Sequence, residues 1–171
     1  MQAYVPQHLD RFLYTLRVVS KEVTHLQETQ KRLFKAGPIS VDWVRNLTAD
    51  DPAQDTLEAF ASRFGRLQDS LADKLLPRLA LLEGEKPGSA IDNLNRAERL
   101  GLIPSTNGWL AMRALRNKLV HEYVADPSEF ASALNQAATF VQELVDAYQR
   151  VRSRAEQRLG TDRARLLDSL F

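Results

Sequence analysis

Residues 7–35, with the sequence QHLDRFLYTLRVVSKEVTHLQETQKRLFK, decide the fold class of this chain. Apolar side chains recur there mostly at steps of three and four residues, which puts them on one face of an α-helix. They are Leu9, Phe12, Leu13, Leu16, Val19, Val23, Leu26, Leu33 and Phe34. Gly37 and Pro38 follow, a pair typical of a helix end because glycine adopts the left-handed conformation and proline cannot extend the helix. The stretch therefore predicts a long helix with one buried face.

The same helical spacing continues through most of the chain. It predicts long helices near residues 51–79, 107–123 and 126–159, and shorter ones near residues 41–47 and 89–100. No segment alternates apolar and polar residues between hairpin turns, as a half-buried strand would, and no repeat of about 20 to 50 residues is visible. We expect an all-α fold, namely an antiparallel helical bundle with additional short helices.

Individual residues predict where these helices begin, bend or end. Pro77 is expected to kink or interrupt the second long helix, because proline lacks the amide hydrogen that an α-helix uses. Asp126 and Pro127 form a start signal, since aspartate caps helices and proline suits the first turn. Gly160 is expected to end the last long helix.

Length and composition indicate a single folded domain. The chain has 171 residues, of which 44% are hydrophobic and 26% charged, and these are ordinary values for a globular protein. We expect residues 1–160 to form the helical bundle and residues 161–171 to add a short C-terminal helical extension. No run of about 18 apolar residues and no secretory signal pattern occurs, so neither membrane insertion nor secretion is expected.

Charge and cysteine content limit the possible chemistry. A net charge of +1 gives no strong overall attraction to nucleic acid, so any RNA contact must come from local clusters. The absence of cysteine excludes disulfides, thiolate nucleophiles and cysteine-ligated metals, and it suits the cytoplasm, which is the expected location. Several arginines make the C-terminal end locally basic, and a solvated helix face is favoured there over an RNA or partner contact. They are Arg150, Arg152, Arg154, Arg158, Arg163 and Arg165.

A grouping of reactive side chains occurs at residues 116–123, with the sequence RNKLVHEY. If this stretch is helical, Asn117 and His121 are neighbours on one face, because they are four residues apart. Arg116 and His121 are five residues apart and therefore point in different directions. They meet only if the arginine side chain wraps round the helix, the helix end unwinds or a second chain completes the site.

This set of groups suits metal-independent cleavage of RNA. A histidine can move the proton of the attacking 2′-hydroxyl or of the leaving oxygen, and an arginine can stabilise charge on the phosphate. One histidine does not easily serve as both acid and base. A symmetric pair of chains, each contributing Arg116 and His121, makes a more complete site, so a homodimer is part of the hypothesis.

The stretch resembles the RX4HXY motif of HEPN-domain proteins, in particular the HepT-like toxins. The resemblance includes the polar Asn117 directly after the arginine and Tyr123 two residues after the histidine, near the end of a late helix. It implies a homodimeric endoribonuclease toxin that needs no metal or other cofactor. Arg116 and His121 would be catalytic at the dimer cleft, with Asn117 and Tyr123 in support.

The same resemblance implies a protein partner. HepT-like toxins are typically paired with a minimal nucleotidyltransferase (MNT) antitoxin, which can transfer AMP to the tyrosine that matches Tyr123. An AMP group beside Arg116 would physically obstruct RNA. Asp69 and Arg63, on the earlier long helix, are weaker candidates for lining the same cleft. The segment around Trp43 and the basic C-terminal end depart from the family pattern.

Two other interpretations stay open. The chain can be a non-catalytic HEPN module that binds a nucleotidyltransferase partner or its nucleotide, which predicts tight partner binding and no RNA cleavage. It can also be a plain helical interaction protein. In that case Arg116 forms an ordinary ion pair with an acid of another helix, and His121 caps a helix end.

Overall fold

The computed structural model describes residues 3–121 and 126–160, and every regular element in this part of the chain is helical. The predicted all-α class is therefore confirmed. The elements are a 3-10 turn at Pro6–His8, α1 (Leu9–Leu33), α2 (Val41–Arg45), α3 (Pro52–Asp69), a π-helical segment at Ser70–Leu75, α4 (Leu76–Leu82), α5 (Ala90–Arg99), α6 (Thr106–His121) and α7 (Pro127–Leu159).

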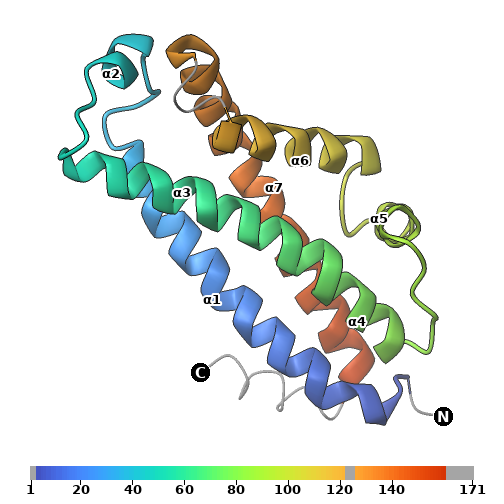
Figure 1. Cartoon of the computed structure of the whole chain (residues 1–171). Coiled ribbons are helices and arrows are strands. Elements are labelled where there is room, and N and C mark those ends of the chain that lie inside the picture. The colour runs from blue at the N-terminus through green and yellow to red at the C-terminus, as the bar shows by residue number, and fades with distance from the viewer. Residues whose placement is uncertain (1–2, 122–125, 161–171) are drawn as a thin grey trace.

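Three long rods, formed by α1, by α3 with α4, and by α7, lie side by side (Figure 1). α1 runs antiparallel to the other two, and α6 crosses the assembly, contacting both α3 and α7. Large side chains from three of these helices meet in the core, among them the fully buried Phe12, Phe60, Phe64 and Phe130. Each is expected to contribute roughly 1.5–3 kcal/mol by leaving water. The apolar stripe predicted for α1 is buried, apart from the half-buried Phe34.

The second rod is interrupted, but not where the sequence indicated. The chain stays helical from residue 52 to residue 82, and six residues ahead of Pro77 form the π-helical segment. Pro77 itself lies in the first turn of α4. Because proline has no amide hydrogen, the ordinary α-helical bond to the carbonyl of Asp73 cannot form, and the wider turn precedes the proline. At this segment the Ser70 hydroxyl donates to Glu22 of α1 at 3.1 Å, and burial raises the pKa of Glu22.

The predicted limits of α7 are confirmed. The Asp126 carboxylate accepts hydrogen bonds from the amides of Ser128 and Glu129 at 3.0 and 3.2 Å, and Pro127 occupies the first turn. Gly160 ends the helix with a φ of 52°, a backbone conformation that residues other than glycine rarely adopt. The predicted extension over residues 161–171 lies outside the described residues. In the described part of the chain, no helix has the length and apolar character needed to cross a bilayer.

Glu83, directly after α4, connects three helices. Its side chain is only 3% exposed, and it accepts a hydrogen bond from Arg96 of α5 at 2.8 Å. From α7, Arg154 donates at 3.1 Å and Arg158 lies 3.5 Å away. Burial alone would raise the pKa of Glu83, but the hydrogen bonds and charges of the three arginines outweigh it and lower that pKa. Two arginines of the basic C-terminal run thus pair with a buried carboxylate, while their side chains stay partly exposed.

Candidate functional site

α6 carries both residues that the sequence predicted to be catalytic. The helix continues without a break through His121, its last residue. In an α-helix, residues five positions apart differ by about 140° in direction, so Arg116 and His121 point to different sides of α6. His121 and Asn117 are exposed, while Arg116 is half-buried against α3. A single chain therefore does not bring Arg116 and His121 together, and Tyr123 lies outside the described residues.

Arg116 is held by Asp69, one of the two residues suggested on the earlier helix. Its Nη1 donates to both carboxylate oxygens of Asp69, at 2.7 and 2.8 Å. The two side chains are 35% and 40% exposed, so solvent screens the pair and its contribution to stability is expected to be at most about 1 kcal/mol. Its main effect is on orientation. In the described part of the chain, both hydrogen bonds of Arg116 come from Nη1, so Nη2 keeps its donors for an anion.

Gly65, one helical turn before Asp69, makes room for the arginine. A Cβ atom added to Gly65 would lie 2.5 Å from Nε and 3.0 Å from Cδ of Arg116, closer than non-bonded atoms approach. The Arg116 side chain can therefore cross α3 at this place only because Gly65 has no side chain. The sequence contained the signal, since a glycine inside a predicted helix often marks a close packing contact, but its partner was not predictable.

Arg63, the other residue suggested on this helix, faces the opposite way. Its Nη1 donates to the hydroxyl of Thr29 and, at 3.4 Å, to the carbonyl of His25, both on α1. The structure thus brings Asp69 but not Arg63 to Arg116. The physical reason is their spacing: six residues correspond to a rotation of about 240° around the helix, so the two side chains cannot share a direction.

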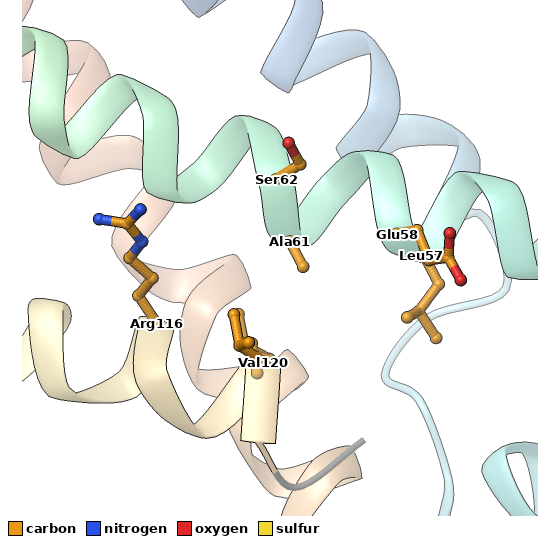
Figure 2. A pocket seen from close by; sticks show the side chains of 7 residues that line it. Leu57, Glu58, Ala61, Ser62, Arg116 and Val120 are labelled. Carbon is orange, nitrogen blue, oxygen red and sulfur yellow. The ribbon is translucent and has the colours of Figure 1, made fainter. Parts of the chain in front are cut away.

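An open groove of about 390 Å³ lies beside Arg116, between α3 and the last turns of α6. Figure 2 shows Arg116 at one end, Glu58 and Leu57 at the other, and Val120 between them. The lining is largely apolar, and Val120 is 64% exposed although it is hydrophobic. The groove thus combines an oriented cation, an apolar wall and a carboxylate. Such a surface suits a ligand or partner with a phosphate and an apolar body.

Among the described residues, no group of three or more histidine, aspartate or glutamate side chains is arranged so that it could hold a metal ion. The charged groups that line the groove are the guanidinium of Arg116 and the carboxylate of Glu58, whereas His121, at the end of α6, does not line it.

Comparison with protein-family models, with curated proteins and with solved structures found no match for this chain. The resemblance to HEPN-domain proteins therefore depends on residues 116–123 and on their position in a helical protein.

Proposed function

We propose that this protein is a metal-independent endoribonuclease of the HEPN type, a cytoplasmic HepT-like toxin with an antiparallel HEPN bundle. The observation that carries the proposal is the position of Arg116, which pairs with Asp69, packs against Gly65 and lines an open groove. His121 ends the same helix, where solvent reaches its imidazole.

The reaction in this proposal is an internal transesterification. The ribose 2′-oxygen attacks the adjacent phosphorus and loses its proton to a base, while the bond from phosphorus to the 5′-oxygen breaks and that oxygen gains a proton. His121 is suited to one of these proton transfers, and Arg116 to stabilising negative charge on the phosphorus oxygens. The products are a 2′,3′-cyclic phosphate and a 5′-hydroxyl.

A homodimer is part of the proposal because one chain supplies only half of the required groups. Arg116 and His121 diverge on α6, and a two-fold axis near its end would bring a second arginine and a second histidine to the same phosphate. The exposed Val120, located between them in the sequence, would be covered in such an assembly. An MNT-type nucleotidyltransferase antitoxin that adds AMP to Tyr123 would then close the site.

A second candidate is a non-catalytic HEPN module that binds a nucleotidyltransferase or its nucleotide. The ion pair with Asp69, an acid of another helix, is what a plain helical interaction protein predicts, and it neutralises part of the charge of Arg116. The two candidates differ in whether the purified protein cleaves RNA on its own.

The purified protein is expected to cleave single-stranded RNA in the presence of excess EDTA. The expected products carry 2′,3′-cyclic phosphate and 5′-hydroxyl ends, which mass spectrometry of the fragments identifies. Sedimentation under the same conditions is expected to give the mass of a dimer. Absence of cleavage by a folded dimer would reject the nuclease and favour the binding module, and cleavage that EDTA abolishes would reject the metal-independent mechanism.

Gly65→Ala is expected to impair the enzyme without unfolding it. Alanine in place of a helical glycine adds roughly 0.5–1 kcal/mol of stability, which offsets the loss of the Arg116–Asp69 pair. Thermal unfolding should therefore change little, whereas cleavage should fall about 10²-fold or more because the guanidinium is displaced. Gly108→Ala is the matched control, since its added Cβ would only reach ordinary contact with Ser105 at 3.5 Å. Equal cleavage by both variants would show that the position of Arg116 is not required.

A further inference from the structure

A second groove, of about 480 Å³, lies where α1 ends and α3 begins. We call it the Trp43 groove, because Trp43 of α2 forms part of its wall together with Arg32 and Lys35. It shares no lining residue with the groove beside Arg116. Trp43 belongs to the segment that departs from the family pattern in the sequence.

The segment that carries Trp43 is fixed to the rest of the fold. The side chain of Asn135 on α7 accepts a hydrogen bond from the amide of Ile39 and donates one to its carbonyl, both at 2.8 Å. Ser40 then caps α2 by accepting from the amide of Trp43 at 3.1 Å. The indole is half-buried against the core. The groove is therefore formed before any ligand arrives, which lowers the entropic cost of binding.

The charge of the Trp43 groove is positive. Arg32, in the last turn of α1, and Lys35, just beyond it, are both exposed, and neither forms an ion pair within the described residues. Asp51 also lines the groove, but its carboxylate accepts from the amide of Ala53 at 2.8 Å and caps α3. The groove thus has two cations without an ion-pair partner in the described residues and one carboxylate that already caps α3. It therefore favours an anion.

We propose that the Trp43 groove binds a nucleotide of single-stranded RNA, with the base against Trp43 and the flanking phosphates at Arg32 and Lys35. An aromatic wall bordered by cations suits this ligand, because bases of any identity stack on aromatic rings and phosphates bind the neighbouring cations. The inference rests on the proposed function, since it describes how the same substrate is held away from the scissile phosphate.

The position of the groove along α3 supports a continuous path for the strand. Thr56 lines the Trp43 groove, whereas the next two residues, Leu57 and Glu58, line the groove beside Arg116. Adjacent residues of one helix therefore border both grooves. An extended strand that crosses the start of α3 contacts both, and RNA too short to cross it contacts only one.

Intrinsic fluorescence tests the inference without any cleavage. The chain has two tryptophans, and Trp109 is 2% exposed, so a bound base can quench only Trp43 directly. The probe is a single-stranded 2′-O-methyl oligonucleotide, which lacks the attacking hydroxyl and is too short to reach the groove beside Arg116. Saturable quenching is expected, with a slope of about −1.4 in the logarithm of the binding constant against the logarithm of salt concentration, as for two phosphate contacts.

Variants of the two cations give the decisive measurement. Lys35→Ala and Arg32→Ala are expected to weaken binding and to reduce the salt slope by about 0.7 each, while Lys86→Ala, an exposed lysine outside this groove, should change neither. Trp43→Ala should weaken binding about 5- to 150-fold, measured by anisotropy of a labelled oligonucleotide. Because Arg32 and Lys35 are exposed, both cation variants are expected to stay folded.

Three results would overturn the inference. They are the absence of quenching, unchanged binding in both cation variants, and quenching by AMP at the same concentration as by the oligonucleotide, which would assign the groove to a mononucleotide. The outcome is separable from that of the nuclease proposal. If the oligonucleotide binds at Trp43 but ordinary RNA is not cleaved, only the nuclease proposal is rejected. If ordinary RNA is cleaved efficiently but the oligonucleotide does not quench Trp43, only this inference is rejected.

Discussion

His121→Ala is expected to lower the rate of RNA cleavage by about 10²- to 10⁴-fold, the range that general acid–base groups contribute. The protein should stay folded, because His121 is exposed at the last position of α6 and substitutions at such positions usually change stability by less than about 0.5 kcal/mol. Initial rates on a labelled single-stranded RNA measure the effect, and circular dichroism checks the fold. His25→Ala is the matched control, since it removes an exposed histidine from α1. Full cleavage by folded His121→Ala protein would end the nuclease hypothesis.

Arg116→Ala is expected to reduce cleavage by about 10²- to 10³-fold, as the loss of one stabilising donor does. Arg113→Ala provides a close control on the same helix. Arg113 is also half-buried and forms a pair with the π-helical segment, 3.8 Å from Asp73. If the two variants lose cleavage equally, the effect comes from general positive charge on α6 and not from the guanidinium that Asp69 and Gly65 orient.

The helices were predictable because their signals are local. The apolar stripe of α1 and the start signal at Asp126 and Pro127 depend on spacing and on backbone preferences within a few residues. The π-helical segment was not predictable in the same way. Pro77 indicated an irregularity, but which residues absorb it depends on how the segment packs against α1, α5 and α7.

The candidate site was predictable only in part. Residues 116–123 identified Arg116 and His121, and the helical period indicated correctly that they diverge. The period does not say which of Asp69 and Arg63 faces α6, because that depends on how α6 crosses α3. Gly65 leaves room for the Arg116 side chain at this crossing. Contacts of this kind join residues far apart in the sequence, and periodicity contains no information about them.

Glu83 illustrates the same limit for stability. Its partner Arg154 lies 71 residues further along the chain, and a run of arginines on a helix is ordinarily a solvated face. The structure instead uses one buried carboxylate to join α5 and the end of α7 to α4. This makes Glu83 the polar side chain whose loss is expected to cost the most stability.

Glu83→Gln is expected to lower the free energy of unfolding by about 2 to 3 kcal/mol. Removing one member of a buried ion pair typically costs 3–5 kcal/mol. The smaller value applies here because Arg96, Arg154 and Arg158 are partly exposed and can recover hydration. Urea unfolding followed by circular dichroism measures the change, and Glu85→Gln, at an exposed position two residues away, is the control. Equal unfolding free energies for Glu83→Gln and the wild type would show that the negative charge of Glu83 does not stabilise the fold.

The stability that Glu83 contributes is expected to depend on pH, with a sign that follows from the lowered pKa of this residue. The folded state holds the carboxylate ionised, so the stabilisation is complete above its ordinary pKa of 4.5 and disappears as the pH falls through the lower folded value. The difference in unfolding free energy between wild type and Glu83→Gln should therefore be constant from pH 7 to about pH 5 and shrink below that. Glu22, whose pKa burial raises, acts with the opposite sign, but it is present in both proteins and cancels in the difference. A difference that grows on acidification would mean that Glu83 is protonated in the folded state. That result would contradict the lowered pKa that its three arginine neighbours cause.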